Sequence, residues 1–147
     1  MPYEASKIAK YFLSLADLDS GDLISNLKLQ KLLYYAQGYY VALNGSKHPL
    51  FDDEVYAWKH GPVVKSVYDL YSKYKDGPLP VGKAPKDLDI KDIKFLDEIY
   101  RVFGKFSAWK LREMTHSEAP WKDNYEPDVK NIVIPIKDLR RYFKLHV

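Results

Sequence analysis

The sequence predicts a mainly α-helical protein: a compact, single-domain helical cluster around a central helix at residues 27–43, with a small two-stranded β-ribbon. Apolar residues recur at intervals of three and four through most of the chain, which is the pattern of amphipathic helices. The stretches near 54–58 and at 131–134 have the composition of short strands. A length of 147 residues suits one domain, and we assign residues 1–147 to it.

The first predicted helix covers residues 4–17. Pro2 fits near its start, where a missing backbone N–H costs nothing. Asp19, Ser20 and Gly21 are expected to end it. The apolar stripe of this helix follows the helical period: Ala5, Ile8, Ala9, Phe12 and Leu15.

The strongest helix prediction covers residues 27–43. Ser25 or Asn26 can cap its start, because both side chains accept hydrogen bonds from free backbone N–H groups. Residues 44–45, Asn-Gly, form a stop signal. One stripe of this helix is apolar: Leu29, Leu32, Leu33, Ala36, Tyr40 and Leu43.

The opposite face of the same helix is not simply charged, since it consists of Lys31, Tyr34, Gly38 and Val41. A helix that is apolar nearly all round is usually central in its fold. Gly38 costs about 1 kcal/mol relative to alanine in a helix interior. We therefore expect another element to approach the helix closely at this glycine.

A strand is predicted at residues 53–58, and Gly61-Pro62 breaks it. Pro62 suits the first position of a new helix, so a helix is predicted over 62–75. Residues 76–88 contain three prolines and two glycines and are therefore a loop. This loop is the one plausible domain boundary, and neither the segment before it nor the segment after it is long enough to fold stably on its own.

A further helix is expected at residues 90–103, with Asp89 as its N-cap and Gly104 at its end. Ser107 can cap a shorter helix that runs through Thr115.

Pro120 interrupts the helical pattern after that segment, and the strand at 131–134 follows. Pro135 ends the strand and starts a last helix, which runs through Phe143 or Leu145.

Composition excludes several classes of protein. The formal net charge is +3, too small to identify a nucleic-acid binder by itself. The chain has no cysteine, which excludes disulfides, thiol catalysis and thiolate metal sites and fits a cytoplasmic protein. The most apolar long stretch, 32–43, is about 12 residues, whereas a bilayer span needs about 20. The N-terminus has no secretory-type apolar core, so no membrane association is expected.

Catalytic motifs are also missing from the sequence. The four histidines have no metal-ligand spacing, and there is no Gly-x-Ser-x-Gly motif or phosphate-binding glycine loop. We expect no catalytic residue, no metal and no cofactor. His116 and Glu118 are neighbours that His60 could join in space. A hydrolase or nuclease built on these three is a weaker alternative to structural histidines at element ends.

Basic residues gather in the predicted last helix: Lys137, Arg140, Arg141 and Lys144. A basic patch on a helix is ordinarily a solvated outer face. A DNA-binding transcriptional regulator that uses this helix is therefore the alternative hypothesis, and nucleic acid is a possible but not a favoured partner.

Three segments together resemble a known family. They are residues 26–38 (NLKLQKLLYYAQG), 57–64 (AWKHGPVV) and 111–121 (LREMTHSEAPW). In this order and spacing they closely resemble the Panacea domain, also called SocA-like or GepA-like, of bacteria and prophages. The resemblance covers roughly residues 5–122 and thins toward the C-terminus.

This resemblance implies a small, mainly helical, non-enzymatic antitoxin of a toxin–antitoxin system. Such proteins bind and neutralise toxins of unrelated folds, and at least one branch delivers its toxin to an ATP-dependent protease. The implied partners are a cognate protein toxin and, in the adaptor form, such a protease. Thirteen tyrosines suit a contact surface and suit a small core equally well.

Residues of the three segments divide into a binding group and a structural group. Aromatic and charge-capable side chains are typical interface anchors, so Tyr34, Trp58, His60 and Trp121 are the candidates for a toxin-binding groove. Burial at the edge of the core is the competing interpretation of the two tryptophans. Lys31 is expected to pair with a buried carboxylate or carbonyl. The structural group is Lys31, Gly38, Gly61, Pro62 and His116.

Overall fold

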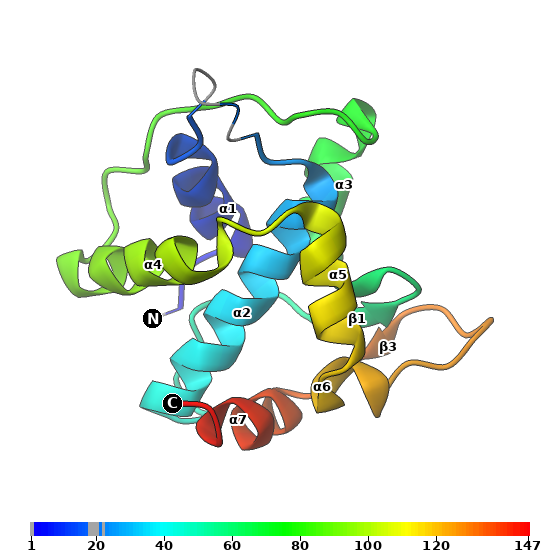
Figure 1. Cartoon of the computed structure of the whole chain (residues 1–147). Helices are drawn as coiled ribbons and strands as arrows, with labels where there is room; N and C mark the ends of the chain where they lie inside the picture. Colours follow the sequence, from blue (N-terminus) through cyan, green and yellow to red (C-terminus); the bar gives the residue numbers. More distant parts are fainter. Residues whose placement is uncertain (1, 18–20, 22) are drawn as a thin grey trace.

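The computed structural model describes residues 2–17, 21 and 23–147. The described part contains α1 (Ala5–Ser14), α2 (Asn26–Asn44), α3 (Lys65–Tyr71), α4 (Ile90–Phe103), α5 (Ala108–His116), α6 (Ala119–Lys122), α7 (Ile136–Lys144), the short 3₁₀ helix η1 (Ser72–Tyr74) and the strands β1 (Val55–Trp58), β2 (Gly61–Val64) and β3 (Ile132–Val133). Helices dominate, as the sequence predicts. Figure 1 shows α2 running through the middle of the molecule, with the other elements around it.

Helix α2 is the centre of the fold. Fourteen of its 19 residues are buried, so it has almost no solvent face. Helices α1, α4, α5 and α7 and strand β2 all contact it. Ser25 caps the helix, because its Oγ accepts a hydrogen bond from the backbone N–H of Lys28 at 3.2 Å. Leu43 departs from the predicted stripe, because it is 61% exposed at the last turn.

Gly38 has the packing role expected for it. A Cβ atom on this glycine would lie 2.2 Å from the ring of Phe143, which belongs to α7. The ring therefore occupies the space of a side chain at Gly38, where α7 packs against α2. Figure 1 shows α7 next to α2. The close approach explains why a residue that is poor in helices sits in the middle of the central one.

The sheet is antiparallel, with the strand order β2-β1-β3. Tyr56 of β1 lies opposite Val133 of β3, so the predicted pairing of the two ribbon segments is confirmed. A third strand joins them, because β2 pairs with β1 from Trp58–Gly61 to Val55–Val64.

The prediction of a helix over residues 62–75 is wrong at its start. Residues 61–64 form β2, and helix α3 begins at Lys65. Gly61 has φ +111°, a conformation open to glycine, and this lets the chain reverse over two residues and pair with β1. Pro62 is tolerated because β2 is an edge strand.

The remaining boundaries follow their local signals. Asp89 and Ser107 cap α4 and α5 as expected. Helix α1 ends at Ser14, and Asp19 and Ser20, which were expected to end it, lie outside the described residues. Pro120 lies inside a short helix, α6, where its ring fits the first turn. None of the described helices is long and apolar enough to cross a membrane.

Candidate functional site

A cleft with a volume of about 1050 Å³ opens beside the first turns of α2. Its walls come from the first turns of α2, the β1–β2 hairpin, α3 with η1, α5 and the loop at 123–131. Five ring-bearing side chains line it: Trp58, His60, Tyr68, Trp109 and Tyr125. A cleft of this size can hold a short peptide segment or a small ligand.

Two tryptophans stand on different walls of this cleft. The Trp58 ring packs edge-on against Tyr68 with 5.1 Å between ring centroids, and its Nε1 donates to Asn131 Oδ1 at 3.3 Å. Trp109 is 55% exposed, and the guanidinium carbon of Arg112 lies 4.4 Å from its ring centroid. A half-exposed tryptophan beside an arginine is the composition of an interface anchor.

Hydrogen bonds within the wall hold α2, β2 and α3 together. The Gln30 side chain accepts from the backbone N–H of Val64 at 2.9 Å and donates to Asn26 Oδ1 at 2.8 Å. Asn26 in turn donates from Nδ2 to the carbonyl of Tyr68 at 3.1 Å. Gln30 and Asn26 are both buried, so this wall is preformed, and ordering it adds little cost to binding.

Lys31 also lines the cleft, although its side chain has no exposed surface. Its Nζ donates to the carbonyl oxygen of Pro62 at 3.2 Å, which confirms the expectation of a buried carbonyl partner. A Cβ on Gly61 would lie 2.7 Å from Lys31 Cε, so the glycine also makes room for the lysine. Burial, and then the positive charge of Arg112, lower the pKa of Lys31 to about 7.

His60 and His116 lie in the same positive field. Arg112 Nε donates to His60 Nδ1 at 3.0 Å, so this nitrogen of His60 acts as an acceptor. Partial burial lowers the pKa of His60, and the charges of Arg112, Lys59 and Lys31 lower it further. Burial lowers the pKa of His116 as well, followed by the charges of Arg112 and Lys31. Within the described part of the chain, none of Lys31, Lys59 and Arg112 forms an ion pair with an acidic side chain.

The four sequence candidates for a groove divide into two pairs. Trp58 and His60 line the cleft. Tyr34 is fully buried, and its hydroxyl donates to Glu118 Oε1 at 2.9 Å. Trp121 is 9% exposed and donates from Nε1 to the carbonyl oxygen of Trp58 at 2.6 Å, so it supports the cleft from behind.

Trp121 belongs to a stack of three rings. Its ring lies 3.9 Å from His116 on one side and 4.7 Å from Tyr125 on the other, nearly parallel to both. The stack connects the end of α5 to the loop at 123–131. His116 thus packs within this stack, and its Nε2 has no hydrogen-bond partner among the described residues.

Glu118 is engaged in the core. Its two carboxylate oxygens accept from Tyr34 at 2.9 Å and from Tyr35 at 2.8 Å. Burial raises the pKa of Glu118 to about 7, against the lowering effect of the two tyrosine hydrogen bonds. The described residues contain no group of three or more histidine, aspartate or glutamate side chains that could hold a metal ion.

Sequence reasoning missed Trp109, and it missed Lys31 as part of a binding surface. The available signal for Trp109 was its spacing of three residues from Arg112, which places both on one face of α5. Lys31 gave no such signal, because its contact with the β1–β2 hairpin joins residues far apart in the chain.

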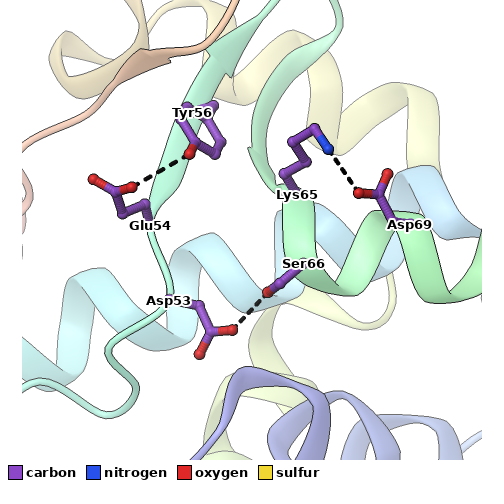
Figure 2. A pocket seen from close by; sticks show the side chains of 6 residues that line it. All are labelled: Asp53, Glu54, Tyr56, Lys65, Ser66 and Asp69. Carbon is purple, nitrogen blue, oxygen red and sulfur yellow. Dashed lines mark hydrogen bonds and ion pairs between the residues drawn. The ribbon is translucent and has the colours of Figure 1, made fainter.

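A second, smaller pocket of about 270 Å³ lies beside β1 and α3 (Figure 2). Its polar side chains are paired with one another. Ser66 Oγ donates to Asp53 Oδ2 at 2.6 Å, and Lys65 Nζ lies 2.7 Å from Asp69 Oδ2. Asp53 also accepts from the backbone N–H of Ala5 at 3.0 Å, so its role here is to join β1, α3 and α1.

This combination of a helical domain, a three-stranded sheet and an aromatic, cationic cleft can be compared with known families. The profile of the family described as "Antitoxin SocA-like, Panacea domain" matches residues 29–122, and the chain belongs to this family. The match runs from the second turn of α2 to the end of α6, so it contains Lys31, the β1–β2 hairpin and Trp109.

Antitoxin SocA of Caulobacter vibrioides is a relative with 36% identity over 113 residues, which covers 67% of this chain. The chain spans 58% of the length of that relative. No solved structure gives a significant match.

Proposed function

We propose that this protein is an antitoxin that neutralises a cognate protein toxin by binding it directly in the cleft. Membership of the SocA-like, Panacea domain family is the observation that carries the proposal, and the name of the Caulobacter vibrioides relative supports it. The cleft adds a place for the contact, because it combines a preformed wall with a half-exposed tryptophan.

Binding fits this site better than catalysis. His60 Nδ1 is occupied by Arg112, and both oxygens of Glu118 are occupied by tyrosines, so neither is poised as a general base. The lowered pKa of His60 keeps its ring neutral at pH 7, which suits a hydrogen-bonding contact. We therefore assign the cleft a recognition role.

Co-expression with each neighbouring gene tests the proposal. The protein should restore growth to cells that express the toxin and should co-purify with it. Trp58→Ala and His60→Ala should weaken both effects. Arg141→Glu on α7 is the control, because that side chain is 74% exposed and does not line the cleft. If the protein restores growth against the product of none of the neighbouring genes, the antitoxin role is refuted. If Arg141→Glu is the only variant that loses function, the DNA-binding alternative is favoured.

The fate of the bound toxin separates two forms of the proposal. In the binding-only form, the toxin accumulates in a stable complex. In the adaptor form, the antitoxin delivers the toxin to an ATP-dependent protease, so the half-life of the toxin falls when the antitoxin is present. Pulse-chase measurement of the toxin in wild-type and protease-deficient cells distinguishes the two.

A further inference from the structure

Lys31 is a buried amine, and no acidic side chain of the described residues pairs with it. Its side chain has no exposed surface, and its ammonium makes one hydrogen bond, to the carbonyl of Pro62. Among the described residues, no carboxylate lies within 4.0 Å of its Nζ. Burying an amine under these conditions costs free energy, and an apolar side chain of similar length would avoid the cost. The stability of the isolated chain therefore does not require a lysine here.

The surroundings of Lys31 are positive from several elements. Lys59 and His60 of the β1–β2 hairpin line the same cleft, and Arg112 of α5 lies close enough to lower the pKa of Lys31. We call Lys31, Lys59 and Arg112 the cation cluster; His60, whose ring is neutral at pH 7, lies beside it and accepts a hydrogen bond from Arg112. The charges of Arg112, Lys59 and Lys31 all lower the pKa of His60, as expected for a site with an excess of positive charge.

The other charged groups around the cleft do not neutralise this cluster. Lys65 is already paired with Asp69 of its own helix. Lys75 and Lys130 add positive charge to the lining, whereas Asp76 and Asp128 are exposed and form no ion pair with Lys31 among the described contacts. Glu113 of α5 is exposed as well. The lining of the cleft thus carries more lysines than acids: Lys31, Lys59, Lys65, Lys75 and Lys130 against Asp76 and Asp128.

We propose that the cleft binds an acidic segment of the toxin, with a carboxylate held at the cation cluster and a neighbouring apolar or aromatic side chain packed against Trp58 and Trp109. This inference rests on the proposed function and names the chemistry of the partner. Arg112 and His60 supply the hydrogen-bonding contact. Lys31 supplies positive charge from below, because a bound carboxylate favours the protonated form of this amine. The low local dielectric makes that charge act strongly.

A peptide carboxylate fits this site better than a nucleic-acid backbone. Nucleic acids are bound by a stripe of cations that neutralises many phosphates, and the net charge of the chain is only +3. The cation cluster is instead a single patch. Lys31 and Lys59 line an open cleft of about 1050 Å³, and Arg112 lies against the ring of Trp109, which lines the same cleft. That geometry favours one acidic side chain and its neighbour.

A random twelve-residue peptide library displayed on phage, selected on the full chain, provides the probe. We expect enriched peptides to carry Asp or Glu beside an aromatic or aliphatic residue. A synthetic peptide of the enriched sequence should bind at least tenfold more tightly than its Glu→Gln or Asp→Asn counterpart, as measured by fluorescence anisotropy.

Variants of the chain then locate the carboxylate. Lys31→Met should weaken binding of the acidic peptide at least tenfold while the melting temperature stays the same or rises. Lys137→Met is the matched control, because it removes one exposed lysine of α7 and should change neither quantity. Lys59→Met gives a second test at an exposed position, so the result does not depend on how Lys31→Met folds.

Three results would overturn the inference: enrichment of neutral or basic peptides, equal binding by Lys31→Met and Lys59→Met, or binding of single-stranded dT12 with a steep salt dependence in place of peptides. Growth rescue separates this inference from the antitoxin role. If wild type and both lysine variants rescue cells equally, the acidic-segment inference fails and the proposed function stands. If acidic peptides bind through Lys31 but no neighbouring toxin is neutralised, recognition of a carboxylate at the cation cluster stands and the antitoxin role fails.

Discussion

Replacing Glu118 by glutamine should change how the stability of this protein depends on pH. In the folded chain burial raises the pKa of this carboxyl from 4.5 to about 7, so the folded state holds a proton that the unfolded state releases. Stability contributed by this group is therefore fully present below about pH 4.5 and is lost as the pH rises to about 7. At about 1.4 kcal/mol for each pH unit, the loss is about 3 kcal/mol.

Glu118→Gln removes the titrating proton and keeps the shape of the side chain. The variant should lack this decline, so the difference in unfolding free energy between variant and wild type should grow by about 3 kcal/mol between about pH 4.5 and pH 7.5. Because a difference is measured, the contributions of His60 and His116, whose pKa values are lowered from 6.5 by burial and by nearby positive charges, cancel. Urea unfolding followed by circular dichroism at four pH values provides the measurement.

A constant difference across this range would refute the reasoning, because it would mean that Glu118 has an ordinary pKa in the folded chain. Lys31 gives an independent check of opposite sign. Its pKa is lowered from 10.5 to about 7, so stability lost to its burial returns as the pH rises from about 7 to about 10.5. The advantage of Lys31→Met over wild type should therefore shrink in that range.

Three further predictions concern packing and the cleft. Gly38→Val should destabilise the chain, because the new side chain meets the Phe143 ring. Phe143→Ala should cost about 3–5 kcal/mol of stability, and in that background Gly38→Ala should be tolerated. Thermal melting of the single and double variants checks this coupling. Tyr34→Phe should cost about 1–3 kcal/mol by removing a buried hydrogen bond to Glu118, measured by urea unfolding; a loss of toxin binding at unchanged stability would contradict this. Trp109→Ala should leave unfolding within about 0.5 kcal/mol of wild type, because the ring is half exposed, but should weaken toxin binding by 1 kcal/mol or more in a titration.

Local patterns of the sequence were sufficient for most elements. Helix α4 begins at the predicted Asp89 cap and ends at Gly104, and α2 was identified as central from the lack of a charged face. Caps and helical periods depend on residues within a few positions of one another, so they can be read along the chain. The close approach at Gly38 could be predicted for the same reason, because glycine destabilises a helix interior and its presence there indicates that another element packs closely against it.

Tertiary structure decided which segment each helix or strand packs against. Residues 61–64 have a composition that allows a helix start, and pairing with β1 made them a strand. The helical period places Tyr34 on the face of α2 opposite the leucine stripe. Phe143 of α7 packs against the Tyr34 ring with 5.4 Å between centroids, so this opposite face is buried as well. A single sequence contains no record of which distant segment covers a helix face.

Part of the candidate site could be predicted from the sequence, and part depended on the tertiary structure. The motif containing Trp58 and His60 was recognisable, and both side chains line the cleft. The buried ammonium of Lys31 beneath them depends on the β1–β2 hairpin folding over α2, with Gly61 leaving room for the lysine. Residue types and their spacing thus determined the elements and the family, whereas burial and the electrostatic field of the cleft came from contacts between distant segments, because desolvation depends on what surrounds a group in space.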